Sequence, residues 1–236
     1  MLWQKIWWDT RWFFLLALGG TIPSCVLVLA LAGNAAQADH QRMVWVMWFR
    51  WLTTVYWPLT ALLMAITILR SFPLFEGPQG ASGLFTLSLP ITRRKTILSH
   101  WAVIMVGTTL ISLAHAPVIS AISRFNGRLF PIKDAFLYSL FTGIGGMASV
   151  SFSYLLIVIF KNNVWTATGL VMAANALLHW PQWVIGEYPW WNVYHVMSGE
   201  SYFHHGEIPW LGLLASLMVS ALMMIVAVRI YEWRDF

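Results

Sequence analysis

The sequence predicts an all-α membrane protein with six transmembrane helices, and its composition and hydropathy pattern carry this prediction. Of its 236 residues, 59% are hydrophobic and only 10% are charged, which is too apolar for a water-soluble domain. Many of the apolar residues lie in runs of about 20, the length an α-helix needs to cross a bilayer. Stretches such as 26–31 and 155–160 are continuously apolar, without the alternation expected of membrane β-strands. Helices satisfy their backbone groups internally, as lipid requires.

Six runs of this kind define the predicted spans of a single transmembrane domain, residues 1–236. They are residues 13–33, 51–69, 97–120, 135–160, 164–185 and 210–231. We expect these spans to pack together without a separate soluble domain.

Residues 1–12 precede the first span and have an amphipathic pattern. Trp3, Ile6 and Trp7 fall on one helical face, with Lys5 largely elsewhere. This pattern predicts an interfacial helix along the cytoplasmic membrane surface.

The positions of Lys and Arg predict the orientation. With a cytoplasmic N-terminus, nine of the 14 Lys and Arg residues lie on the inner side and five on the outer side. The last outer segment, 186–209, has three Glu and no Lys or Arg, which agrees. Both termini are therefore predicted to be cytoplasmic.

Two sequence features are absent, and their absence narrows the classes of function to consider. No Asp or Glu lies at the apolar centre of a predicted span, which disfavours ion-coupled carriers and intramembrane aspartyl enzymes, since these use a buried carboxylate. No Gly-x-x-x-x-Gly-Lys-Ser/Thr segment occurs, so any ATP chemistry must come from a partner.

Several uncharged or weakly basic polar residues lie within the predicted spans. Thr168, Asn175 and His179 are spaced by seven and four, so they share one face of the fifth span. Ser112 and His115 lie close together on the third span. These residues either line a translocation path or form hydrogen bonds between helices, and the sequence leaves both interpretations open.

Small residues recur every four positions on two predicted spans. This spacing permits close helix contact, either within the chain or with a second copy. The residues are Gly145, Ser149 and Ser153 on the fourth span, and Gly212, Ser216 and Ser220 on the sixth.

Histidines in the last outer segment raise the question of a metal site. His204 and His205 are adjacent, and His195, Glu200 and Glu207 are near them in sequence, so a surface Zn or Cu site is chemically possible. Neither an HExxH nor an HxxxH helical pair is present. Unpatterned histidines are usually polar surface residues, so the sequence predicts no metal site but leaves the question open for His204 and His205.

The longest predicted cytoplasmic connection is residues 70–96, and the succession of residue types along it indicates its structure. Glu76 precedes a Gly- and Pro-containing stretch at 77–83, an apolar stretch at 84–89, and Pro90. The segment then ends in a basic triplet, Arg93, Arg94 and Lys95. We expect a short amphipathic helix at the membrane surface that ends before Pro90. The alternative is that the triplet only anchors the loop on the inner side.

This segment resembles the permease subunits of ABC-2 type transporters. In that family, spans two and three are joined by a cytoplasmic segment containing Glu and then Gly, which ends in a Leu-Pro-Val/Ile-Ser/Thr-Arg-Arg motif. The matching residues here are Glu76, Gly80 or Gly83, Leu89, Pro90, Thr92, Arg93 and Arg94. The resemblance extends to the surface helix, six spans, long last outer loop and short charged tail. His100 is a departure, since many relatives have Lys there.

The resemblance implies a subunit that is not itself an enzyme and has no cofactor of its own. Two permease chains, expected to be identical, pair with two copies of an ATP-binding subunit that holds ATP and Mg. The loop helix acts as a coupling helix in a groove of that ATPase, and 186–209 forms a re-entrant segment over the exit path. Lipid is the other expected partner, and nucleic acid is not expected. The implied coupling residues are Glu76, Gly80, Gly83, Leu84, Phe85, Leu87, Pro90, Arg93, Arg94 and Lys95.

The expected function is therefore that of an ABC exporter permease in the bacterial cytoplasmic (inner) membrane. Its candidate path lacks strong charge, so an apolar or amphipathic cargo such as a lipid, hydrophobic peptide or antibiotic is expected. One alternative is a metal-binding integral membrane enzyme that uses histidines such as His115 or His179. Another is a non-transporting membrane partner that keeps the permease fold.

Overall fold

The computed structural model describes residues 2–31, 92–125, 131–160, 164–185 and 189–233, and these residues form helices without a β-strand. The helices are α1 (Leu2–Leu31), α4 (Arg93–Phe125), α5 (Ile132–Ile159), α6 (Val164–Ile185), α7 (Val193–Met197), α8 (Glu200–His205) and α9 (Trp210–Glu232). The all-α class is therefore confirmed. The predicted span at 51–69 and most of the predicted coupling segment, through residue 91, lie outside the described residues.

Three of the described helices are long and apolar enough to cross a bilayer, as expected for a membrane protein. They are α4, α5 and α9. Each lies within a few residues of a predicted span. Helix α6 contains the polar residues Asn175 and His179 and also Pro181.

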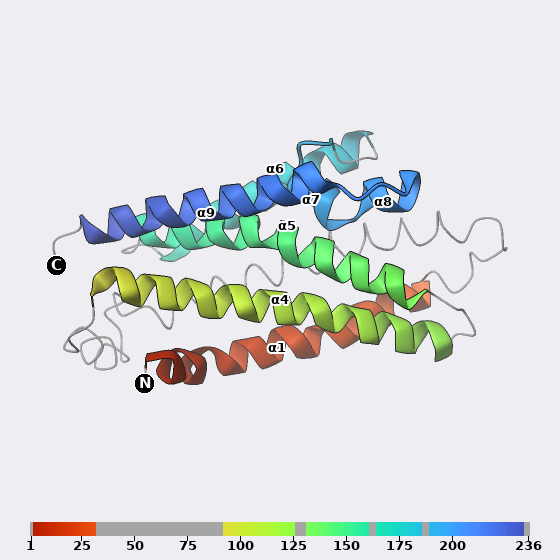
Figure 1. Ribbon diagram of the computed structural model, residues 1–236, viewed down its shortest axis with the longest axis horizontal. Helices are drawn as coiled ribbons and strands as arrows, with labels where there is room; N and C mark the ends of the chain where they lie inside the picture. The colour runs from red at the N-terminus through yellow and green to blue at the C-terminus, as the bar shows by residue number, and fades with distance from the viewer. Residues whose placement is uncertain (1, 32–91, 126–130, 161–163, 186–188, 234–236) are drawn as a thin grey trace.

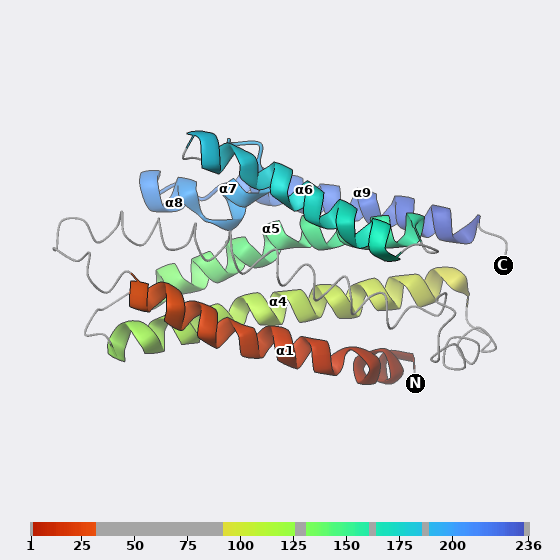
Figure 2. The same cartoon turned by 180° about the vertical axis from the view of Figure 1, so that it is seen from behind.

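The helices pack in layers around α5 (Figures 1 and 2). Helix α1 packs on α4, α4 packs on α5, and α6 and α9 both pack on α5. Sixteen of the 28 residues of α5 are buried, compared with seven of the 23 in α9. The core is therefore centred on α5, and α9 presents a large apolar surface outward.

The direction of the helices gives the bundle two distinct ends. The starts of α1 and α4 and the end of α9 lie together at one end, which we call the basic end because α4 begins there with Arg93-Arg94-Lys95 (Figure 1). Helices α7 and α8 lie at the opposite end, which we call the α7 end.

Helix α1 corrects one predicted boundary. The sequence analysis separated a surface helix at 1–12 from a span starting at 13, but residues 2–31 form one continuous helix. No Gly or Pro occurs between residues 2 and 18, so nothing in this stretch breaks the helix. Trp8 and Trp12 are exposed, and the Arg11 guanidinium carbon lies 3.5 Å from the Trp8 ring centroid.

The basic triplet is also placed differently from the sequence expectation. The sequence analysis assigned it to the loop, whereas Arg93 is the first residue of α4. Thr92 precedes the helix, and its hydroxyl accepts a long hydrogen bond of 3.4 Å from the Lys95 backbone N–H. Thr at this position satisfies a helix-terminal N–H group, and Arg and Lys are good helix formers, so the helix extends back to the triplet.

Candidate functional site

Helix α7 is short but deeply packed between the longer helices. Tyr194 and Met197 are fully buried, and α7 contacts α5, α6 and α9. Small residues on the neighbouring helices permit this approach. A Cβ atom at Gly145 of α5 would lie 2.6 Å from Met197 Cγ, and one at Gly212 of α9 would collide with Val196. At these two positions the small residues therefore serve contacts within the chain.

A buried chain of hydrogen bonds joins α7 to α6. Asn192 Nδ2 donates to the Leu178 carbonyl oxygen at 2.6 Å, and Asn192 Oδ1 accepts from the Tyr194 N–H at 2.9 Å, which caps α7. The Tyr194 hydroxyl donates to Asn175 Oδ1, and Asn175 Nδ2 donates to the Val171 carbonyl oxygen at 2.7 Å. Asn175 therefore holds the α7 segment in place.

The predicted path residues on α6 lie partly at this contact. The His179 ring lies against Tyr194, with ring centroids 3.9 Å apart, next to the Asn175 hydrogen bond. Thr168, on the same helix, is half-buried. The predicted face thus brings Asn175 and His179 together beneath α7.

The predicted path residues on α4 lie elsewhere, at the contact between α4 and α5. His115 Nδ1 lies 3.0 Å from the Ser112 carbonyl oxygen, and the His115 ring meets Tyr138 edge-on at 6.3 Å. A Cβ atom at Gly143 would lie 3.3 Å from Ser112 Cβ. Ser112 and His115 therefore pack between helices, apart from the α7 contact.

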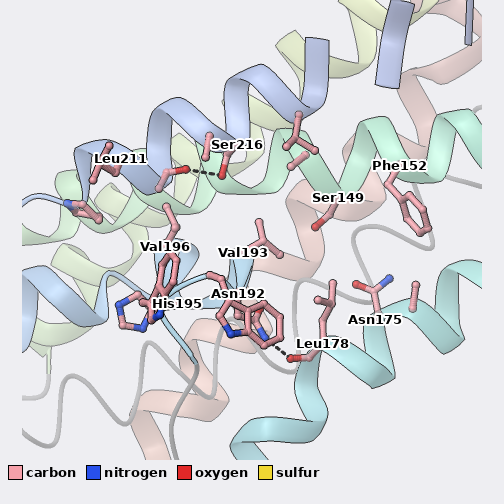
Figure 3. A pocket seen from close by; sticks show the side chains of 18 of the residues that line it. Ser149, Phe152, Asn175, Leu178, Asn192, Val193, His195, Val196, Leu211 and Ser216 are labelled. Carbon is pink, nitrogen blue, oxygen red and sulfur yellow. Dashed lines mark hydrogen bonds between the residues drawn. The ribbon is translucent and has the colours of Figure 1, made fainter. Parts of the chain in front are cut away.

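A cavity of about 960 Å³ lies between α5, α6 and α9, beside α7 (Figure 3). Its walls include Ser149 and Phe152 from α5, Asn175 and Leu178 from α6, and Val219 from α9. The α7 segment closes one side with Asn192, Val193 and Val196. Most of this lining is apolar, which suits an apolar ligand.

Polar contacts fix α8 next to α7. His195 Nε2 lies 2.8 Å from Ser201 Oγ, and His195 Nδ1 lies 3.5 Å from Glu200 Oε2. The Tyr202 hydroxyl donates to Asp134 Oδ1 at 3.1 Å, which joins α8 to the start of α5. These contacts tie the segment between α6 and α9 to the central helix.

The histidines at the α7 end do not gather into a larger cluster. In the part of the chain that the structure describes, no three His, Cys, Asp or Glu side chains lie close enough to hold a metal ion. His204 and His205 have ring centroids 6.2 Å apart, and both are exposed.

At the basic end, two residues of the triplet are accessible. Arg94 and Lys95 are exposed and border a shallow depression of about 390 Å³ with Thr92 and Leu98. This surface offers two cations beside apolar atoms. The other predicted coupling residues, Glu76 to Pro90, and the Arg93 side chain lie outside what the structure describes.

The sequence did not reveal two sets of contacts, although Ser220 was already among the small residues predicted to lie at helix contacts. Asn192 and Tyr194 organise the α7 contact, and the only local signal was an Asn preceding a short apolar stretch, as at a helix N-cap. Trp101, Ser151 and Ser220 link three helices: Trp101 Nε1 donates to Ser151 Oγ at 3.0 Å, which lies 2.6 Å from Ser220 Oγ. No sequence spacing relates residues on three separate helices.

Comparison of the chain with family models, with characterised proteins and with solved structures gives no match.

Proposed function

We propose that this chain is the membrane-spanning permease subunit of an ABC-2 type exporter. In this proposal α1, α6 and the segment 51–69 join α4, α5 and α9 to make six spans. A separate ATP-binding subunit supplies ATP hydrolysis, and two copies of the chain form the permease. Both termini are cytoplasmic in a bacterial inner membrane, and the cargo is apolar or amphipathic.

The observation that carries the proposal is the Leu-Pro-Ile-Thr-Arg-Arg motif, residues 89–94, which leads directly into α4. Arg94 and Lys95 are exposed in the first turn of this helix, next to the apolar Leu98. Cations beside an apolar surface suit docking on an acidic protein groove. The start of α4, with Arg93 and Arg94, is also at the end of the bundle where α1 starts and α9 ends, as expected if that end is cytoplasmic (Figure 1).

The packing offers a continuous mechanical connection from the basic end to the α7 end. The Trp101–Ser151–Ser220 hydrogen bonds join α4 to α5 and α9. On the other side of α5, the Thr142 hydroxyl donates to the Met197 carbonyl oxygen of α7 at 3.0 Å. Movement imposed on α4 by nucleotide-driven closure of the ATPase would therefore reach α7 through packed helices.

The α7 and α8 pair supports the proposed exit side. In this proposal residues 189–209 form the re-entrant segment, with α7 inserted between the helices and α8 held near the surface. Burial of Tyr194 and Met197, next to the exposed His204, is consistent with a segment that enters the bundle and leaves on the same side.

Charge reversal tests this proposal. We expect Arg93→Glu/Arg94→Glu to abolish co-purification of the ATPase from native membranes in mild detergent, because the variant turns an attractive charge contact into a repulsive one. Arg124→Glu/Lys133→Glu is the matched control. It reverses two exposed charges, one in the last turn of α4 and one in the first turn of α5, at the end of the bundle away from the basic end, and should leave the ATPase bound.

Correct insertion must be verified, since removing inner positive charges also acts on topology. Arg93→Ala/Arg94→Ala, which retains Lys95, provides a milder variant for this purpose. An ATPase that remains bound to a correctly inserted charge-reversal variant would contradict the coupling assignment. A chain that purifies without an ATPase but with bound metal would favour the membrane enzyme instead.

A further inference from the structure

We propose that the cavity between α5, α6 and α9 binds one neutral lipid carrying a hydroxyl or carbonyl group, which pairs with the Ser149 hydroxyl. As an assignment of cargo class, this inference rests on the proposed exporter function. As a binding site, it stands on the geometry of the cavity alone.

Ser149 provides the polar contact. The residue is only 9% exposed, and its hydroxyl has no hydrogen-bond partner among the described residues. Ser139 and Ser153, on the same helix, both donate to a carbonyl oxygen four residues earlier, at 2.9 Å. Figure 3 shows Ser149 extending from α5 toward Val193 and Leu178 across the cavity. Among the described residues, the Ser149 hydroxyl is therefore a buried donor and acceptor without a partner at the wall of the cavity.

Because Ser149 lies deep in the protein, the lack of a hydrogen-bond partner for its hydroxyl in the described part of the chain is energetically costly. Ser149 lies in the middle turns of α5, one of the candidate spans, where lipid offers no replacement hydrogen bond. An unsatisfied polar group in such surroundings is costly. A hydroxyl or carbonyl group on a bound molecule would remove this cost.

Other buried polar groups around the cavity are already engaged within the protein. Asn192 bonds to Leu178 and Tyr194, and Asn175 bonds to Tyr194 and Val171. These groups shape the walls. Among the buried polar side chains that line the cavity in the described part of the chain, Ser149 is left to select the ligand.

The charge of the lining determines the class of ligand. Its residues, within the described part of the chain, include no Lys, Arg, Asp or Glu. The lining histidine, His195, contacts Ser201 and Glu200. A charged headgroup placed deep in this cavity would lack a counter-ion at a position where isolated charge is expensive. A neutral ligand is therefore expected.

The rim of the cavity indicates where the ligand comes from. Leu177 of α6, Leu211 of α9 and Trp190 before α7 line the cavity, yet 72%, 86% and 82% of their surfaces are exposed. The cavity thus opens onto an apolar surface, part of it on the candidate span α9. A lipid can enter sideways from the bilayer, and about 960 Å³ is near the upper end of usual ligand pockets.

Two photoreactive probes that differ by a single group test this inference. One is a long-chain fatty alcohol bearing a diazirine, and the other is the alkane with the same chain and diazirine. The full chain, in lipid vesicles, is irradiated with each probe, and labelled peptides are identified by mass spectrometry. We expect the alcohol to label the walls at Phe152, Leu178 and Val219, and Ser149→Ala to weaken that labelling about fivefold, as for loss of one neutral hydrogen bond.

Matched variants separate the cavity from general effects. Ser139→Ala removes a hydroxyl already bonded within α5 and should leave labelling unchanged. Ala174→Leu and Ala215→Leu, which fill the cavity from two different helices, should reduce labelling by both probes. Ala221→Leu adds the same volume to the exposed surface of α9 and should not.

Two results would overturn the inference: alcohol labelling that is insensitive to Ser149→Ala, or labelling confined to the outer helix surfaces. The assay needs neither ATP nor an ATPase. Failure to find an ATPase would therefore contradict the proposed function without affecting this site.

Discussion

Gly212 shows how one residue sets the position of α7. A Cβ atom there would collide with Val196, whereas a Cβ atom at Gly169 would meet nothing within 4 Å. We expect Gly212→Ala to destabilise the protein by about 1–3 kcal/mol because it overpacks this contact. Gly169→Ala should be neutral or slightly stabilising, because Ala is the better helix former. Thermal unfolding in detergent measures both variants.

The double variant Gly212→Ala/Val196→Ala gives a sharper test of the same contact. Removing the Val196 methyl groups makes room for the new Cβ, so part of the lost stability should return. The loss of stability in the double variant should be smaller than the sum of the losses in the two single variants. A larger loss would contradict the packing of α7 against α9.

At the residue scale, helical spacing predicted that Thr168, Asn175 and His179 share one face, and in the structure Asn175 and His179 both contact Tyr194. The sequence could not identify Tyr194 as their partner. That contact depends on the return of the chain after α6, which no local pattern specifies.

At the scale of elements, α7 offers a clear test because an isolated helix of five residues is unstable in water. Its amides at Tyr194 to Met197 should nevertheless exchange slowly with deuterium, since the helix is buried among α5, α6 and α9. The amide of Glu207, which is exposed after α8, should exchange quickly and provide the internal reference. Fast exchange throughout α7 would contradict its packing inside the bundle.

Long helices were predictable where apolar runs were continuous, as in α4, α5 and α9. Their ends were less predictable. The basic triplet begins α4 because Thr92 caps it, and α1 has no break near residue 12 because this stretch contains no helix breaker. Helix α7 is too short to show a periodic pattern, so its position comes from tertiary contacts.

At the scale of the whole molecule, the arrangement of the helix ends predicts sidedness. In a Cys25→Ala background, cysteines at Lys95, Trp233 and His204 replace exposed residues. We expect a membrane-impermeant thiol reagent to reach Lys95→Cys and Trp233→Cys from the cytoplasmic side and His204→Cys from the opposite side. Labelling of the first two positions from different sides would contradict the proposed topology.

The central claim is that this chain is a permease driven by a partner ATPase, and its most direct test is the composition of the complex purified from native membranes. The complex is extracted in mild detergent. Quantitative mass spectrometry then gives its composition, and an ATP hydrolysis assay of the same sample gives its activity. The account predicts an ATP-binding subunit with a P-loop, present in a one-to-one ratio with this chain and active in hydrolysis. A chain that purifies intact, in a preparation shown to preserve other transporter complexes, with no ATP-binding partner would contradict it.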